Sequence, residues 1–121
     1  MSKQSLGTHG ETLATAYLED NQYIIIERNW HCQRGEIDII AQDTQTGEWV
    51  FCEVKTRRST KTADAFASIT PQKQAKMIAS AQTYMHTHDL EDVAWRIDAI
   101  AVAIRPHQAP LIDHAKDALA W

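Results

Sequence analysis

The sequence predicts one α/β domain in which a mixed central sheet is flanked by helices. Two segments repeat apolar residues at helical spacing, and four short runs rich in β-branched and other apolar residues alternate with them. Their order is α-β-β-β-α-β, which is typical of a sheet covered by helices. The chain of 121 residues contains no repeat or low-complexity tract, so we expect residues 1–121 to form a single domain.

Each predicted helix has one apolar stripe. The first covers about residues 6–20, with a stripe of Leu13, Ala14, Tyr17 and Leu18. Gly10 lies on the same stripe, where a glycine weakens the helix but lets a neighbouring segment come close. The second begins at Pro71 with Thr70 as its N-cap and ends within residues 86–89. Its stripe is Met77, Ile78, Ala81, Tyr84 and Met85.

The four predicted strands are residues 23–28, 36–42, 48–55 and 95–104. The turn sequence DTQTG joins the second and third strands in a β-hairpin. The last strand is nearly all apolar after Asp98, which we interpret as structural, so we expect a central strand. The crossover that leads to it should be right-handed if the strands it joins are parallel neighbours.

The remaining segments are predicted as connectors. Residues 29–35 and 56–69 are polar, and the basic stretch 57–61 has nothing to bury. Residues 111–121 are compatible with a short strand or a short helix.

The hairpin brings charged residues together on a strand that otherwise looks buried. Side chains alternate along it, so Glu53 and Lys55 point to the same side. Folding the hairpin symmetrically about Gln45 and Thr46 places Asp38 across from Glu53. Directly opposed carboxylates are destabilising, and a divalent cation is the simplest compensation. Oxygen ligands favour Mg²⁺ or Mn²⁺.

Two carboxylates, a metal and a lysine are the groups that phosphodiester hydrolysis uses. We predict Asp38 and Glu53 as metal ligands and Lys55 as the group beside the attacking water. The competing interpretation is an inert, solvated cluster of charges on an edge strand, because a D…ExK spacing alone is a weak pattern.

The residues around this pattern extend the signal. Gly35 to Asp38 (GEID) and Val50 to Arg57 (VFCEVKTR) resemble the signature of the YraN family of small bacterial proteins. Further matches are GTHGE at 7–11, Tyr17-Leu18, RNW at 28–30 and RID at 96–98, so the resemblance covers nearly the whole chain. Ile37 stands where the wider PD-(D/E)xK nuclease motif has proline.

The resemblance implies a restriction-endonuclease-like or Holliday-junction-resolvase-like fold and a metal-dependent endonuclease, with branched DNA as a possible substrate. It also implies that Glu11 supplies a third carboxylate to the metal; a first-turn glutamate favoured by the helix dipole is the alternative. Resolvase-like enzymes act as dimers on two-fold symmetric junctions, so a homodimer is an open expectation.

Basic residues beside the pattern suit a nucleic-acid partner. Residues 28–76 hold eight basic and six acidic residues, although the whole chain has a net charge of −4. We predict phosphate contacts for Arg57, Arg58, Lys61 and Lys73, with DNA favoured over RNA. Each of these side chains could instead be an ordinary solvated cation.

Two other function classes stay open, and both differ from a nuclease. One is a non-catalytic nucleic-acid-binding protein on a nuclease-like fold. The other is a redox or zinc protein built on Cys32 and Cys52. The six histidines are interpreted as solvated, and Trp30, in a connector, could stack on a base. Without a signal peptide or a long apolar run, we expect a cytoplasmic protein without membrane contact.

Overall fold

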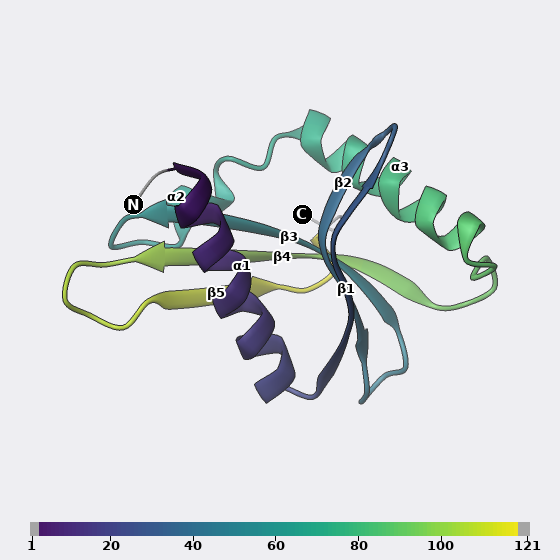
Figure 1. The fold of residues 1–121 in the computed structure, drawn as a ribbon, viewed down its shortest axis with the longest axis horizontal. Helices are drawn as coiled ribbons and strands as arrows, with labels where there is room; N and C mark the ends of the chain where they lie inside the picture. Colours follow the sequence, from purple (N-terminus) through teal and green to yellow (C-terminus); the bar gives the residue numbers. More distant parts are fainter. Residues whose placement is uncertain (1–2, 119–121) are drawn as a thin grey trace.

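The structure is a computed structural model that describes residues 3–118, and it has a five-stranded sheet with helices packed on it (Figure 1). The helices are α1 (Lys3–Asp20), α2 (Ala63–Phe66) and α3 (Pro71–Thr87). The strands are β1 (Tyr23–Cys32), β2 (Gly35–Asp43), β3 (Trp49–Arg58), β4 (Trp95–Ile104) and β5 (Leu111–Ala115).

The strands lie in the sheet in the order in which they occur in the chain. Strands β3 and β4 are parallel, and every other neighbouring pair is antiparallel. The predicted class of a mixed α/β sheet flanked by helices is therefore confirmed, and it is consistent with a nuclease-like fold. The parallel pair is joined through α2 and α3, which is the crossover that the sequence predicts.

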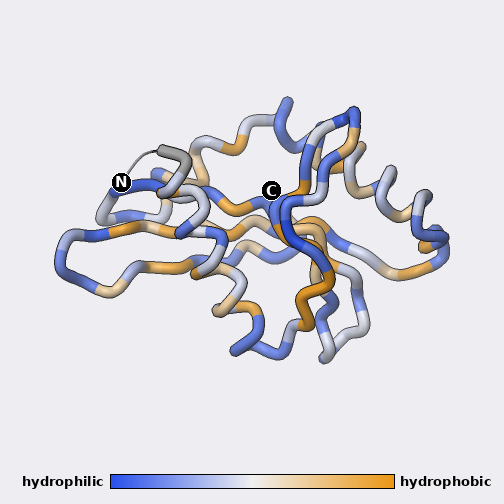
Figure 2. Tube along the Cα trace, in the orientation of Figure 1, coloured by the Kyte–Doolittle hydropathy of each residue, from blue (hydrophilic) through white to orange (hydrophobic). Residues whose placement is uncertain are grey.

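The two long helices bury different parts of the sheet. Ala14 and Leu18 of α1 pack in one cluster with Ile39, Val50 and Cys52. A second cluster joins α3 to the sheet through Met77, Ala81, Tyr84, Met85, Ile37, Ile40 and Phe51. Figure 2 shows the hydrophobic colour concentrated along the strands and the hydrophilic colour at the turns between them. The sheet is thus the middle layer, with its central strands covered on both faces.

The hairpin register and the second helix match the prediction closely. Ile39 pairs with Cys52 and Ala41 with Val50, as the symmetric hairpin requires. The Thr70 hydroxyl accepts a hydrogen bond from the backbone N–H of Lys73 at 3.2 Å and caps α3. The alternation of faces, however, does not hold at Ile37, which packs with Ile40 and Phe51 instead of sharing the face of Ile39.

Two predicted connectors are partly wrong. Strand β1 continues to Cys32, so Trp30 lies in a strand, and its ring meets Tyr84 of the core with 5.2 Å between ring centroids. Strand β3 continues through Arg57 and Arg58, which pair with Ala103 and Ile104 of β4. The neighbouring strand supplies hydrogen bonds to the backbone N–H and C=O groups of these residues. Their polar side chains give no sign of this pairing in the sequence.

The structure adds two elements to the predicted order. The one-turn helix α2 lies inside the predicted connector 56–69 and buries Ala65. Residues 111–115 form a strand that pairs with β4, which resolves the choice between strand and helix for the C-terminal segment; residues 119–121 lie outside the described part. Within residues 3–118, each helix lacks the length or the apolarity that a membrane crossing would require.

Candidate functional site

The candidate site lies where the β2–β3 hairpin opens. The regular pairing ends at Ile39 and Cys52, and Asp38 and Glu53 would be the next pair in that register. The Asp38 carboxylate instead accepts a hydrogen bond from the backbone N–H of Val54 at 2.7 Å. A side-chain oxygen therefore takes over the role of a main-chain acceptor, and this bond fixes the Asp38 carboxylate beside Glu53.

Asp38 is held in an environment that disfavours its charge. Only 8% of the residue is exposed, and burial, followed by the charge of Glu53, raises the pKa of Asp38 to about 8. The hydrogen bond from Val54 acts in the opposite direction, whereas the nearby Glu11 and Glu36 raise the pKa further. A cation at this point would let these carboxylates ionise together.

Glu53 and Lys55 lie next to each other on β3, as their spacing predicts. The Lys55 Nζ and Glu53 Oε1 atoms are 3.0 Å apart, and both side chains are mostly buried. The lysine therefore stands next to a candidate metal ligand, with its charge directed at the carboxylates.

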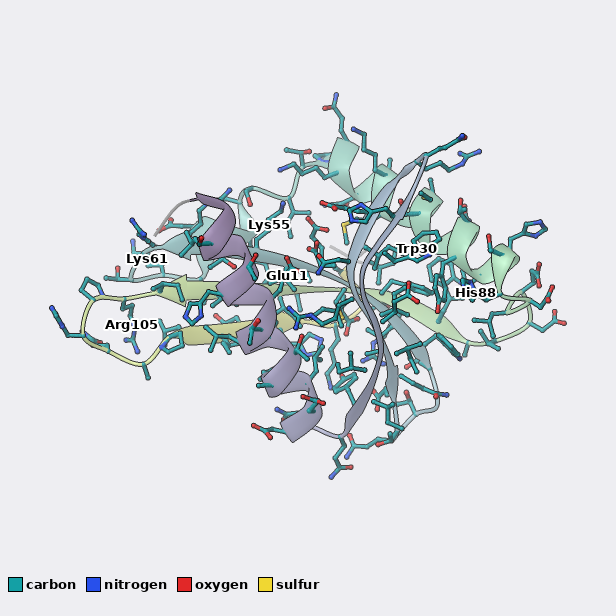
Figure 3. All side chains as sticks on the ribbon, viewed as in Figure 1. Glu11, Trp30, Lys55, Lys61, His88 and Arg105 are labelled. Carbon is teal, nitrogen blue, oxygen red and sulfur yellow. The ribbon has the colours of Figure 1, made fainter. Side chains whose placement is uncertain are left out.

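Glu11 reaches the same region from α1 because of a close helix–strand contact. A Cβ atom on Gly10 would lie 1.7 Å from the Thr56 hydroxyl oxygen, so only glycine allows α1 to pack this closely on β3. The prediction of a close approach at Gly10 is confirmed. Glu11 and Lys55 consequently lie on adjacent elements in Figure 3.

The Glu11 carboxylate is only partly compensated. Its Oε1 atom is buried and has no hydrogen-bond partner. Burial raises the pKa of Glu11, Arg28 lowers it, and the charges of Glu36 and Glu53 raise it. Glu11, Glu36, Asp38 and Glu53 thus form one electrostatically linked group, which we call the carboxylate cluster.

The donor atoms of the carboxylate cluster suit a hard divalent cation. All are carboxylate oxygens, and an unpartnered buried oxygen of Glu11 is available to a ligand. In the described residues, however, no three histidine, cysteine, aspartate or glutamate side chains are arranged so that they could hold a metal together. The arrangement fits a site of one or two carboxylates completed by water and substrate phosphate, which is a common mode of Mg²⁺ binding.

Two surface hollows meet at Lys55. One has a volume of about 210 Å³ and is lined by Glu36, Glu53, Lys55, Lys73 and Lys76 together with Gly35 and Met77. The other, of about 350 Å³, lies between α1 and β3 and is lined by Glu11, Lys55 and Arg57 among others. A ligand at Lys55 is therefore accessible from two directions.

The predicted phosphate-binding residues are divided by this geometry. Lys73 and Arg57 line the two hollows, one each. Arg58 and Lys61 are exposed and line neither; Lys61 lies in the loop that follows β3, away from Lys55 in Figure 3. The Lys73 ammonium also donates to the Ser68 carbonyl at 3.0 Å, which holds it near the start of α3.

Sequence reasoning did not assign site roles to Glu36, Lys76 or Arg28. Glu36 could have been found, because the symmetric folding of the hairpin places it across from Lys55. Lys76 lies one helical turn after Lys73, and that spacing is a usable signal. Arg28 acts on Glu11 across the gap between β1 and α1, so only the tertiary structure shows it.

The two cysteines do not form one site. Cys52 is buried in the cluster beneath α1, whereas the Cys32 thiol lies 3.9 Å from the Ser80 hydroxyl of α3. They face opposite sides of the sheet, which contradicts a shared zinc or disulfide centre at these residues.

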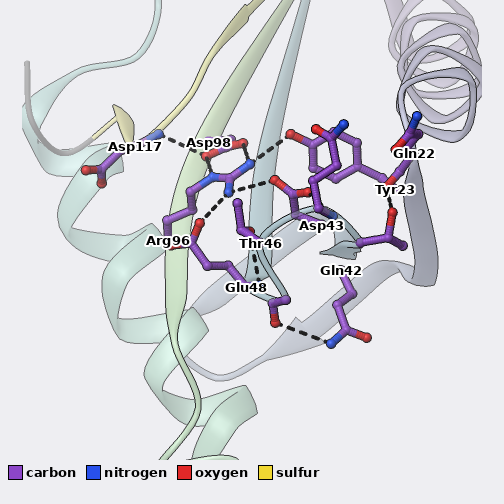
Figure 4. Close-up of polar contacts among 12 residues, drawn as sticks. Gln22, Tyr23, Gln42, Asp43, Thr46, Glu48, Arg96, Asp98 and Asp117 are labelled. Carbon is purple, nitrogen blue, oxygen red and sulfur yellow. Dashed lines mark hydrogen bonds and ion pairs between the residues drawn. The ribbon is translucent and has the colours of Figure 1, made fainter.

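A second group of buried charges lies at the other end of β3 and β4 (Figure 4). Arg96 donates to Asp98, Asp43, Glu48 and the Tyr23 hydroxyl, at distances from 2.7 to 3.3 Å. Asp98 is fully buried and also accepts from the Asp117 backbone N–H. Every partner of Asp98 belongs to the fold itself, in agreement with its interpretation as structural.

His114 corrects the interpretation of all histidines as solvated. Its side chain is 3% exposed, its Nε2 atom lies 2.6 Å from an Asp98 oxygen, and its Nδ1 atom lies 3.1 Å from the Tyr17 hydroxyl. We call Arg96, Asp98, His114 and their partners the Arg96 network.

Comparison with known proteins gives a consistent family match. The model of a family described as "Uncharacterised protein family UPF0102" matches residues 10–102, a span that contains the whole carboxylate cluster. A UPF0102 protein of Geotalea uraniireducens (strain Rf4) is 44% identical over 115 residues, which cover 95% of this chain and 89% of that protein. A UPF0102 protein of Pseudarthrobacter chlorophenolicus is 38% identical over 120 residues, covering 99% and 89% respectively. Their names state no activity.

Proposed function

The chain belongs to the uncharacterised protein family UPF0102, which is the YraN type that its motifs resemble, and we propose that it is a metal-dependent endonuclease. The substrate would be nucleic acid, DNA in preference to RNA, with branched DNA as one class of substrate to test. The observation that carries the proposal is the burial of Asp38 beside Glu53, at the point where the hairpin opens and next to Lys55.

Asp38 and Glu53 would hold Mg²⁺ or Mn²⁺, and Glu11 would supply a third carboxylate once its unpartnered oxygen turns to the ion. The ion, when bound, polarises the scissile phosphate and lowers the pKa of water. Lys55 would orient the attacking water and stabilise the negative charge that develops on the phosphate. Glu53, which forms an ion pair with Lys55 in this structure, would bind the cation instead, and this would leave Lys55 available for the substrate.

The surroundings of this site support an anionic substrate. Lys73 and Arg57 line the hollows on the two sides of Lys55, and Arg58 and Lys61 continue the positive charge beyond them. Both cysteines are free thiols, which suits a reducing compartment, so we propose action in the cytoplasm. If the substrate is a two-fold symmetric junction, a homodimer is the matching assembly.

The first experiment is calorimetric titration with Mn²⁺ of the wild type, Asp38→Asn and Asp92→Asn. Asp92 is an exposed aspartate in the loop before β4 and serves as the matched control. We expect saturable binding in the wild type and the control and none in Asp38→Asn. Equal binding in all three proteins would contradict the metal site.

The second experiment tests catalysis on branched, single-stranded and duplex DNA. Lys55→Ala should abolish cleavage while metal and substrate binding persist, whereas Lys116→Ala, a change of an exposed lysine far from the site, should have no effect. Cleavage that survives in Lys55→Ala would remove the proposed role of Lys55.

A non-catalytic nucleic-acid-binding protein is the second candidate. It is favoured by the Lys55–Glu53 ion pair and by the lack of a three-ligand arrangement among the described side chains. It predicts that wild type binds nucleic acid without cleaving it, and that Lys55→Ala weakens this binding.

A further inference from the structure

Three hollows follow one another along the surface at the candidate site. The hollow between α1 and β3 shares Lys55 with the hollow in front of Glu53. The latter shares Gly35, Glu36 and Lys76 with a third hollow of about 450 Å³, which extends to Arg34 and the turn between β1 and β2. Together the three hollows form one groove, which runs from Arg57 past Lys55 to Arg34.

Basic residues line all three hollows. Arg57 lines the first, Lys73 and Lys76 line the middle one together with Glu36 and Glu53, and Arg34 lines the third; Glu11 accompanies Arg57, and Glu36 also accompanies Arg34. A polyanion would be attracted by these basic residues, and repelled by the carboxylates unless a cation is bound there. This is the pattern expected for a chain of phosphates that crosses a metal site.

The part of the groove beyond Glu53 is held in shape by packing. Its walls are α3 and the end of the β1–β2 hairpin, which touch each other at Ser80. A Cβ atom on Gly35 would lie 3.0 Å from the Ser80 hydroxyl, and the Cys32 thiol lies 3.9 Å from it. Lys76 is on α3 one turn before Ser80, and Arg34 lies in the turn of the β1–β2 hairpin. The packing at Ser80 therefore sets the position of the two backbone segments that carry these basic side chains.

We propose that one strand of nucleic acid runs along this whole groove, with Arg57 on one side of the cleaved phosphate and Lys76 and Arg34 on the other. This inference rests on the proposed nuclease function and deepens it. Lys76 and Arg34 become substrate-binding residues although neither belongs to the nuclease motif. Because basic residues lie on both sides of Lys55, cleavage occurs within a strand and needs no free end.

The binding test uses the Lys55→Ala background, which is expected to remove cleavage but keep metal binding, with Mn²⁺ present and a fluorescent oligonucleotide of about 20 nucleotides titrated at several salt concentrations. Arg57→Glu and the pair Arg34→Glu/Lys76→Glu should each weaken binding about tenfold and flatten the salt dependence, by about 0.7 in log–log slope for each lost contact. The two effects should multiply, because the two ends are separate. Lys116→Glu, which makes at an exposed position elsewhere the same change of charge as Arg57→Glu, should change neither quantity.

A shorter oligonucleotide of about four nucleotides sharpens this test, because it can bind at either end but cannot span both. Charge reversal at one end alone, by Arg57→Glu or by Arg34→Glu/Lys76→Glu, should then weaken binding about twofold. Charge reversal at both ends should abolish it. An equal loss in Lys116→Glu, or no loss in Arg34→Glu/Lys76→Glu, would overturn the proposed path.

The cleavage test uses closed circular single-stranded DNA, which the wild type should cut. If the wild type cuts only linear DNA from an end, both the path and the endonuclease activity are wrong, and a nuclease that needs a free end remains. If it cuts neither this DNA nor branched or duplex DNA, but the charge reversals weaken binding as described, the path stands and the nuclease function fails. Normal cleavage and binding in Arg34→Glu/Lys76→Glu would remove the path alone.

Discussion

Asp38 is the residue whose chemistry is most constrained by the fold. Its carboxylate is fixed by the Val54 N–H, buried, and placed near three other carboxylates. In the absence of a cation, ionising Asp38 is unfavourable in the folded protein but not in the unfolded chain, so it lowers the free energy of unfolding. A buried carboxylate whose ionisation lowers the stability of the folded protein is typical of a functional site.

The first prediction concerns the pH dependence of this cost. The pKa of Asp38 is about 8 in the folded protein and about 4 in the unfolded chain, so the unfolded chain holds fewer protons between these values. The free energy of unfolding should therefore fall as pH rises from about 4 to about 8. Asp38→Asn removes the cost and should be more stable than wild type at about pH 9, on the order of 1 to 3 kcal/mol, in urea titrations with EDTA.

Two controls make this prediction specific. Asp92→Asn, at an exposed position, should follow the wild type at every pH. Adding Mn²⁺ should stabilise the wild type more at high pH than at low pH, because binding requires the ionised carboxylate. A wild-type stability that rises between pH 5 and pH 8 without metal would contradict the assigned environment of Asp38.

The second prediction concerns Glu11. If its unpartnered oxygen binds the ion, Glu11→Gln should weaken Mn²⁺ binding by about tenfold while leaving it detectable, since Asp38 and Glu53 remain. Glu19→Gln on the exposed side of the same helix is the matched control. Calorimetry distinguishes the cases, and an affinity equal to that of the control would place Glu11 outside the metal's ligands.

At the scale of elements, the site depends on how closely α1 packs on β3. Gly10 and Thr56 define this distance, because a Cβ atom at residue 10 has no space. Glu11 follows Gly10 directly, so the same contact that packs the helix also delivers a carboxylate to the motif strand.

The third prediction follows from this contact. Alanine in place of a helical glycine normally stabilises a protein by about 0.5 to 1 kcal/mol. Gly7→Ala should do so, because nothing lies within 4 Å of its added Cβ. Gly10→Ala should instead destabilise by about 2 kcal/mol and weaken Mn²⁺ binding, because α1 must move away from Thr56.

A second substitution tests the cause. Thr56→Ala in the Gly10→Ala background removes the hydroxyl that would lie at 1.7 Å but leaves the Thr56 Cβ position at 2.8 Å, so it should restore part of the stability. If Gly10→Ala is as stable as Gly7→Ala in urea titrations, the close packing at residue 10 is wrong.

Some elements could be predicted from local sequence and others could not. The hairpin register follows from one short turn and alternating faces, and α3 follows from Thr70, Pro71 and its stripe. The extension of β1 and of β3 could not be predicted, because polar residues such as Arg57 and Arg58 gain strand structure from a distant partner. The nearness of two predicted ligands, Asp38 and Glu53, follows from extending that register by one pair beyond the observed pairing, whereas the placement of Lys76 and Arg34 needs the packing of the hairpin on α3.

At the scale of the whole molecule, the Arg96 network joins segments that are distant in the sequence. Arg96 and Asp98 lie on β4, Asp43 and Glu48 flank the β2–β3 turn, and His114 lies on β5. The histidine and the turn acids give no local sign that they meet, since each looks like an ordinary solvated residue. Only the assembled sheet shows that the turn acids share the buried Arg96 cation and that His114 contacts the buried Asp98 carboxylate.

The last prediction concerns the contribution of this network to the free energy of unfolding, which should be lost in acid. Burial alone would raise the pKa of Asp98, but the hydrogen bonds from His114 and Arg96 lower it below the ordinary value. Its contribution is therefore complete above the unfolded pKa of about 4 and is lost as pH falls through the lower folded value. Asp98→Asn should cost about 3 to 5 kcal/mol at neutral pH, because it leaves Arg96 and His114 without their shared carboxylate, and the cost should shrink in strong acid. Urea titrations at about pH 7 and about pH 3 measure both values, with the exposed Asp92→Asn as the control.

Folded Asp98→Asn should bind Mn²⁺ as the wild type does, because the carboxylate cluster is separate from the network. A loss of metal binding without a loss of stability would instead make Asp98 part of the site.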